Sequence, residues 1–274
     1  MTAERITPSP KVSLLEFFGT ELRRLRTKAS WAQGELASAA HTTQSMICKI
    51  ERARQVPSIE MSESLDAALA TDGHFARLHP LVLAYAYPAW FLPYVEMERE
   101  ATAIREFQGQ VVPGLLQTEA YARALLSTRR PDSLDDLVTS RLSRQEVLER
   151  PSRPRAWFVL DEQVLRRRVG DARLVGEQLE RLLSAASEPR TVVQIIPDSR
   201  GVHAGLDGSF SLLSSSSGEV LHLEGFFEGR LSIDPTETAE ALHAYDLLRA
   251  DALPPCQSAD LIREYLRGLT TWGT

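Results

Sequence analysis

Apolar positions in the first part of the chain repeat with the period of an α-helix. The repeat predicts an amphipathic helix from about Leu14 to Lys28 and another from Ile59 to Ala70, with two short helices between them in residues 31–52. On the first helix, the arginines at 23, 24 and 26 are expected to lie mostly on the face opposite the apolar one. Asp72-Gly73 is a stop signal after the last of these helices. The pattern therefore predicts an all-α bundle of four or five helices with a modest core.

The two short helices have the spacing of a helix-turn-helix. The positions expected to face inward are small or apolar, namely Leu36, Ala37, Ala40, Ile47 and Ile50. His41 and Thr42 form the turn, and the Thr43 hydroxyl can accept a backbone N–H as the N-cap of the second helix. In such a motif the N-terminal part of the second helix enters the major groove of DNA.

The outward positions of this segment are the candidate DNA contacts. Gln44 is expected to read a base edge, because its amide can pair bidentately with adenine, while Ser45 and Met46 add polar and thymine-methyl contacts. Lys49 is expected to reach a guanine or a phosphate. Phosphate contacts that fix docking are expected from Gln33, Arg52 and Arg54. The full set of predicted contacts is Gln33, Thr43, Gln44, Ser45, Met46, Lys49, Arg52 and Arg54.

The second part of the chain changes from helical to mixed patterning. Helices are expected over 96–107, 117–127, 134–150, 171–187, 235–249 and 258–269, and strands over 155–160 and 191–196. Residues 210–213 and 220–223 are expected to pair as a hairpin around a loop from Ser214 to Gly218. This order predicts a mixed α/β domain with a small sheet and flanking helices.

These patterns divide the chain into four parts. They are a flexible arm at 1–13, a helix-turn-helix domain at 14–75, a junction at 76–95 and an α/β domain at 96–274. The junction holds the most apolar stretch, but Pro80, Pro88 and Pro93 interrupt it, so it is not expected to cross a membrane.

Charge differs between the two ends of the chain. Residues 1–60 contain nine Lys or Arg against six Asp or Glu, a balance of +3, whereas the rest carries 22 against 31, a balance of −9. A positive N-terminal part can neutralise phosphates, while an acidic remainder is repelled by DNA. With two cysteines and no basic and apolar leader pattern, we expect a cytoplasmic protein without a disulfide framework.

Residues 14–72 resemble the XRE or Cro-like transcription regulators. The resemblance rests on FGTELRRLR at 18–26, on Gln33 with Glu35-Leu36-Ala37, and on Thr43-Gln44-Ser45 leading to the Lys49-Ile50-Glu51-Arg52 run. The chain departs from that family at His41 and Ala53, where glycine is common, and at Thr42, which replaces a commonly apolar residue. Histidine tolerates a positive φ better than most residues do, though less well than glycine.

Residues 90–268 resemble the domain of unknown function that accompanies this helix-turn-helix in actinomycete XRE-family regulators. The matching residues are 112–122, Arg144-Gln145, Leu160-Asp-Glu162, Gly201-Val-His-Ala204, Gly208-Ser-Phe210 and Leu223-Glu224. The resemblance implies a sensing or partner-docking domain and supplies no established ligand. The candidates for contact with a ligand or partner are Trp157, His203, Phe210, Glu224 and Phe226.

Other chemistry is not supported by spacing. His203, His222, Glu224 and His243 are zinc-ligand types without a short ligand motif, and the serines at 214–217 lack a nucleophile elbow. Asp161 and Glu162 are expected to begin a helix after a strand, and the glycines at 201, 205 and 208 to form a turn. We therefore expect no catalytic residue, metal or cofactor.

The sequence thus predicts a sequence-specific transcription regulator, expected to be a homodimeric repressor on a pseudo-palindromic operator of double-stranded DNA. The C-terminal domain is expected to respond to a small protein partner or, alternatively, to a small molecule. Two other classes stay open. One is an interaction or antirepressor protein that has lost base reading, suggested by His41, Thr42 and Ala53, and the other is an enzyme.

Overall fold

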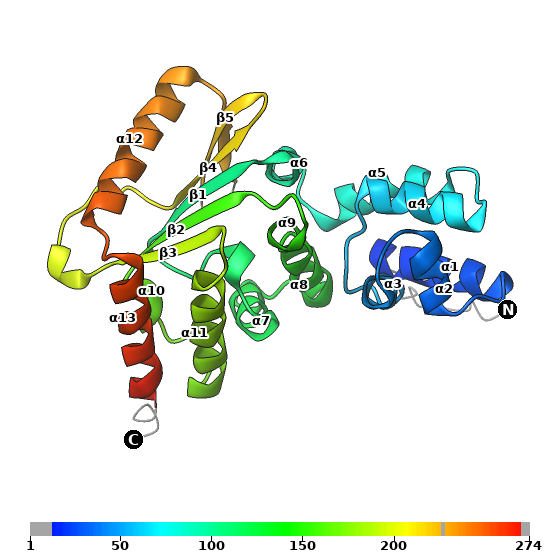
Figure 1. Ribbon diagram of the computed structural model, residues 1–274, viewed down its shortest axis with the longest axis horizontal. Helices are drawn as coiled ribbons and strands as arrows, with labels where there is room; N and C mark the ends of the chain where they lie inside the picture. The colour runs from blue at the N-terminus through cyan, green and yellow to red at the C-terminus, as the bar shows by residue number, and fades with distance from the viewer. Residues whose placement is uncertain (1–12, 226–227, 270–274) are drawn as a thin grey trace, which may run out of the picture. The chain divides into compact units, whose positions relative to one another are not determined.

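The computed structural model describes residues 13–225 and 228–269, and the chain forms two compact units, residues 1–88 and 89–274 (Figure 1). All but the last residue of the predicted arm at 1–13 lies outside the described residues, as does Phe226. No helix in the described part of the chain is long and apolar enough to cross a membrane.

The first unit is all-helical, as predicted. Its described helices are α1 (Leu14–Lys28), α2 (Gln33–Ala39), α3 (Gln44–Glu51), α4 (Ile59–Leu69) and α5 (His74–Ala86). The fifth helix occupies residues that the sequence pattern assigned mainly to a junction, and it packs against α1 and α4. The Asp66 carboxylate accepts the backbone N–H groups of Phe75 and Ala76, at 2.9 and 2.8 Å, and so caps the start of α5. The helical core therefore extends beyond residue 75, with Phe75, Val82 and Leu83 buried.

Two non-glycine residues take left-handed conformations at the ends of the helix-turn-helix helices. His41 has φ 53° and Ala53 has φ 54°, the region in which glycine is favoured. After α2, the Thr42 N–H bonds to Ala37 O at 2.8 Å, and after α3 the Arg54 N–H bonds to Lys49 O at 2.8 Å. Both ends thus close with the hydrogen bonds of a Schellman motif, and the chain keeps this geometry without the common glycines.

Replacing Ala53 by glycine is therefore expected to stabilise the first unit by about 1 kcal/mol, because an L-residue at a positive φ is strained by its Cβ. Ala67→Gly is the matched control, since Ala67 is exposed within α4 and glycine there costs about 1 kcal/mol. Denaturant unfolding of the two variants measures both effects. A loss of stability on Ala53→Gly would contradict the assignment of strain to this position.

In the described residues of the second unit, six strands form a mixed sheet with helices on both faces (Figure 1). The strands are β1 (Ala103–Gln108), β2 (Arg155–Asp161), β3 (Thr191–Ile196), β4 (Phe210–Ser215), β5 (Gly218–Leu223) and β6 (Arg230–Ser232), in the order β3-β2-β1-β4-β5-β6. The first three strands pair in parallel, and the others join them antiparallel. This arrangement confirms the predicted α/β class.

Two hydrophobic cores lie on opposite faces of this sheet. One face packs against α12 (Pro235–Asp251), with Phe107, Phe210 and Tyr245 in its core. The opposite face, called the α11 face below, packs against α11 (Ala172–Ala186) and other helices. These are α6 (Leu92–Glu100), α7 (Glu119–Ser127), α8 (Leu134–Ser143), α9 (Glu146–Glu149), α10 (Gln163–Arg166) and α13 (Pro255–Gly268), with the short 3-10 turns Gly114–Leu116 and Asp198–Arg200 in the connections.

Three sequence predictions about this unit were wrong in detail. The helix expected over 96–107 is instead the end of α6 followed by β1, the central strand next to β2 and β4. Residues 134–150 form two helices, because the chain turns at Arg144, whose side chain pairs with Glu98. The hairpin strands extend to Ser215 and Gly218, so its loop is shorter than expected. The strand β6 was not anticipated at all.

Candidate nucleic-acid interface

Helix α3 presents one buried face and one exposed face. Ile47 and Ile50 are buried in the core of the first unit, whereas Gln44, Ser45 and Lys49 are exposed and Met46 is half-buried. Thr43 caps the helix as predicted, because its hydroxyl accepts the N–H of Met46 at 3.2 Å. The start of α3 is therefore fixed while its polar side chains stay available to a partner.

The Gln44 side chain lies near the start of α2, at Gly34. A Cβ built on Gly34 at the start of α2 would lie 3.9 Å from Gln44 Oε1, so the Gln44 side chain passes over α2 without crowding it. The Gln33 side chain is partly engaged, because its amide nitrogen donates to Glu51 Oε2 at 2.8 Å. Arg52 and Arg54 are exposed just after α3. The predicted base-reading and phosphate-binding residues thus occupy α3, the residues that flank it and the start of α2.

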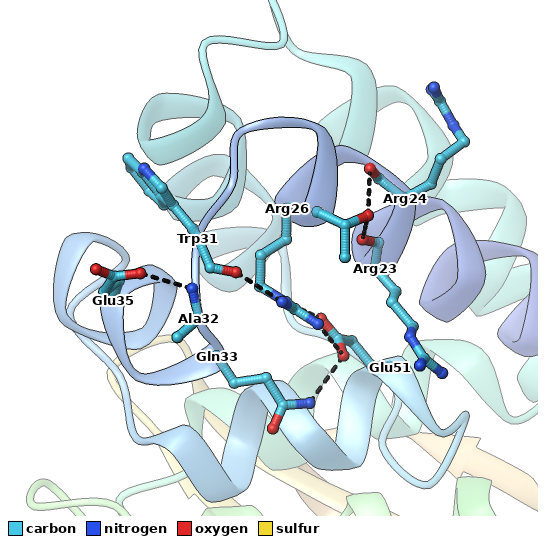
Figure 2. A network of polar contacts seen from close by, with 9 residues as sticks. Arg23, Arg24, Arg26, Trp31, Ala32, Gln33, Glu35 and Glu51 are labelled. Atoms are coloured by element: carbon cyan, nitrogen blue, oxygen red, sulfur yellow. Dashed lines mark hydrogen bonds and ion pairs between the residues drawn. The ribbon is translucent and has the colours of Figure 1, made fainter.

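A buried ion pair joins the helices of this motif. Arg26 of α1 donates to both oxygens of Glu51 in α3, at 2.5 and 3.0 Å, and to the carbonyl oxygen of Trp31 at 2.7 Å. Figure 2 shows the Glu51 carboxylate between Arg26 and Gln33, so that one carboxylate links α1, α2 and α3. The side chains of Arg26 and Glu51 are 10% and 3% exposed, and the hydrogen bond to Glu51 raises the pKa of Arg26. The prediction that Arg26 lies outward was wrong.

Helices α1 and α3 also approach closely through backbone. A Cβ added at Gly19 of α1 would lie 2.4 Å from the carbonyl oxygen of Ile50 in α3. Real Cβ atoms do not reach that distance, so this position requires glycine. The ion pair and the glycine contact together hold α3 against α1.

The candidate ligand or partner residues of the second unit do not gather at one place. Phe210 lies in the core under α12, and the ring of Phe107 contacts both Phe210 and His203. His203 Nε2 bonds to Asp161 Oδ2 at 2.9 Å and its Nδ1 accepts the Gly205 N–H, which makes the histidine an anchor for its loop.

Trp157 and Glu224 have separate environments. Trp157 donates to Gln194 Oε1 at 2.7 Å, and the guanidinium of Arg249 covers its ring at 3.9 Å. Glu224 is exposed and accepts a hydrogen bond from Gln108 on the α11 face. Asp161 and Glu162 precede α10, as the sequence predicted, with Asp161 Oδ1 accepting the Gln163 N–H.

A group of polar residues on the α11 face escaped the sequence analysis. Glu106 and Gln108 are buried on β1, and Arg141 of α8 lies within electrostatic range of Glu106. The sequence AIREFQ of Ala103–Gln108 carries no clear period-two signal, because two apolar residues are followed by two charged ones, and the segment was interpreted as helical.

Two family models match the chain. Residues 18–78 match a model described as a helix-turn-helix domain, and residues 91–264 match one described as a domain of unknown function (DUF5753). No curated protein and no solved structure matches the chain. The two matches confirm the expected pairing of a helix-turn-helix with a C-terminal domain of unknown function. The second match covers more than half of the chain. The chain therefore belongs to the family defined by this domain of unknown function, here preceded by a helix-turn-helix domain.

Proposed function

We propose that the protein is a sequence-specific transcription regulator that reads DNA with α3. The observation that carries the proposal is the geometry of this helix, whose buried face is fixed by Glu51 while Gln44, Ser45 and Lys49 remain exposed. A rigid helix with polar side chains at its N-terminal end suits insertion into the major groove. The helix-turn-helix match over residues 18–78 supports the same role.

The proposed regulator is a homodimer that binds a pseudo-palindromic operator and represses by occluding the promoter. Two recognition helices related by a two-fold axis would enter successive major-groove faces about 34 Å apart. The protein would act in the cytoplasm, where its DNA target lies, without a catalytic step or a cofactor.

The second unit is proposed to receive the signal, either from a small protein partner, as the family resemblance implies, or from a small molecule. A signal changes DNA binding only if it favours one state of the regulator over another. Copurification of a small protein that alters DNA affinity would support the first source. The buried polar residues around Gln108 favour a small molecule as the signal.

An interaction protein that has lost base reading is the alternative to this proposal. It was suggested by His41, Thr42 and Ala53, and two of these residues, His41 and Ala53, adopt the left-handed conformation that glycine would take. The turn into α3 and the end of α3 are therefore closed by hydrogen bonds in spite of the substitutions. Weak binding that ignores DNA sequence and falls steeply with salt would restore that alternative.

Alanine at Gln44 and alanine at Arg52 are expected to weaken DNA binding in different ways. Gln44→Ala should relax the preference at one operator position and cost about 1 to 3 kcal/mol there, because a bidentate base contact is lost. Arg52→Ala should weaken binding to all sequences similarly and reduce the salt dependence by about one phosphate contact. Affinities for the operator, for single-position variants and for a scrambled duplex separate the two patterns. An equal loss across sequences for both variants would refute this division of roles.

A further inference from the structure

A group of polar side chains is buried on the α11 face where β1, β4 and β5 run side by side. Glu106 of β1 lies opposite Ser211 of β4, and Ser211 lies opposite His222 of β5. Gln108 follows on the same face of β1, and its amide nitrogen donates to Glu106 Oε1 at 2.9 Å and to Glu224 Oε1 at 2.7 Å. With Arg141 of α8, these residues are called the polar cluster. It runs from buried Glu106 and Gln108 to exposed Glu224 at the surface.

Two buried atoms of the polar cluster lack a hydrogen-bond partner among the described residues. Gln108 is only 2% exposed, yet its Oε1 accepts nothing, and Nε2 of His222 is also unpaired. The carboxyl groups of Glu106 and Glu224 accept from the nitrogen of Gln108 and fix the orientation of its amide, and its oxygen is left without a donor among the described residues. Buried polar atoms in native proteins are nearly always paired, and an unpaired acceptor of this kind is suited to a donor from a bound molecule.

Arg141 of α8 is an incompletely paired cation within electrostatic range of Glu106 and Glu224. Its one hydrogen bond is a long one, 3.2 Å from Nη1 to Gln117 Oε1, and it forms no ion pair with any described carboxylate. Burial lowers its pKa to about 10, with Glu224 and Glu106 in electrostatic range. Its neighbour Arg144 differs, because it bonds both oxygens of Glu98 at 2.9 and 2.7 Å. Arg141 therefore keeps guanidinium donors for a planar anion such as a carboxylate.

We propose that the polar cluster binds a small zwitterion with a carboxylate and a protonated amine, in particular a free α-amino acid. The carboxylate would pair with Arg141, and the ammonium would donate to Gln108 Oε1 beside Glu224. Arg141 supplies a positive charge and Glu224 a negative charge at different places in the cluster. A net-neutral ligand that carries one charge of each sign therefore complements both. A simple anion would bring a second negative charge near Glu224 and leave the buried Gln108 Oε1 without a donor. The role of this ligand as the signal of the regulator rests on the proposed function. Ligand binding itself is measured without DNA, so its failure can be told apart from a failure of the proposed DNA binding.

The buried carboxyl of Glu106 provides an independent signature of such a ligand. Burial raises the pKa of Glu106 to about 8; Gln108 and Arg144 oppose the rise, and Glu224 and Glu98 add to it. At pH 7 we therefore expect Glu106 to be largely protonated in the free protein. An ammonium that offsets the charge of Glu224 removes one cause of the raised pKa, so binding at pH 7 should release a proton. Calorimetric titration in two buffers of different ionisation enthalpy detects this release.

The direct test is titration of the full-length protein with each of the twenty proteinogenic amino acids, followed by thermal unfolding and calorimetry. At least one amino acid should raise the melting temperature. For that amino acid, the amine without the carboxylate and the acid without the amine should each bind at least about tenfold more weakly. Absence of binding by all twenty at about 10 mM would overturn the proposal and leave the cluster to ordered water. If the acid without the amine bound as tightly as the amino acid, the proposed class of ligand, a zwitterion, would be wrong.

Variants assign the binding to this cluster. Arg141→Gln should weaken amino-acid binding by about tenfold or more, and Arg141→Lys should weaken it less, since the charge remains. Glu224→Gln removes the charge of an exposed residue without threatening the fold, and it should weaken binding and reduce the proton release. Glu240→Gln on α12 is the control, because Glu240 is exposed on the helix that covers the opposite face. Unchanged affinity in both Arg141→Gln and Glu224→Gln would refute the assignment.

Discussion

Alanine at Glu51 is expected to destabilise the helix-turn-helix unit by about 3 to 5 kcal/mol. The substitution leaves the buried Arg26 guanidinium without its carboxylate, and breaking a buried ion pair from one side typically costs that much. It also removes the acceptor of the Gln33 amide, so the link among α1, α2 and α3 is lost. The loss should fall on the same elements that present the predicted DNA contacts.

Hydrogen exchange of the full-length protein measures this effect in the first unit alone. Amides in α1 and α3 that exchange through global opening of the unit should exchange at least about a hundredfold faster in Glu51→Ala. Glu63→Ala, an exposed residue of α4, is the control and should change stability by less than about 0.5 kcal/mol. Arg26→Ala should act like Glu51→Ala, and the double variant should cost less than the sum of the two. If the losses of the two single variants added up in the double variant, or if Glu51→Ala cost less than about 1 kcal/mol, the ion pair would not hold the helices together.

Alanine at Gly19 is expected to cost about 3 kcal/mol, the upper end of the range for overpacking. The added methyl would meet the backbone carbonyl of Ile50 at 2.4 Å, and a backbone atom cannot move away as a flexible side chain can. Helices α1 and α3 would have to separate, which shifts the recognition helix. We therefore expect weaker DNA binding together with the loss of stability.

Gly34→Ala is the matched control for Gly19→Ala. Gly34 also lies within a helix, but the nearest atom to a built Cβ is Gln44 Oε1 at 3.9 Å, an ordinary contact. The change should leave the fold intact and stabilise it by a few tenths of a kcal/mol, because alanine favours a helix over glycine by up to about 1 kcal/mol. Denaturant unfolding of both variants compares them. If Gly19→Ala were as stable as Gly34→Ala, the close approach of α1 and α3 would be wrong.

The helices and strands with a single clear period could be predicted from the sequence. Thr43 was correctly placed as an N-cap, and β3 matches the predicted range because its β-branched run has no competing pattern. By contrast, β1 contains Arg105, Glu106 and Gln108, residues common in helices. Their polar groups are accommodated in a strand by partners from distant parts of the chain, such as Glu224, and tertiary contacts of this kind are not visible in local periodicity.

Arg26 shows what the sequence could have revealed. It follows Leu22 by four residues, as Leu22 follows Phe18, so helical spacing places it on the buried face. Its charge argued for an exposed position, and only the partner Glu51, 25 residues away, explains why it is buried. The polar cluster escaped prediction for the same reason, since Arg141, Gln108 and Glu224 come together only in the folded unit.

Selection of bound sites from a random pool of double-stranded DNA, with the full-length protein, tests the central claim most directly. The account predicts enrichment of an inverted repeat whose half-sites are centred one helical turn, about 10 base pairs, or a multiple of it apart. The selected site should bind at least about a thousandfold more tightly than a scrambled duplex at physiological salt. No enrichment, or equal affinity for the two duplexes, would contradict a sequence-specific regulator.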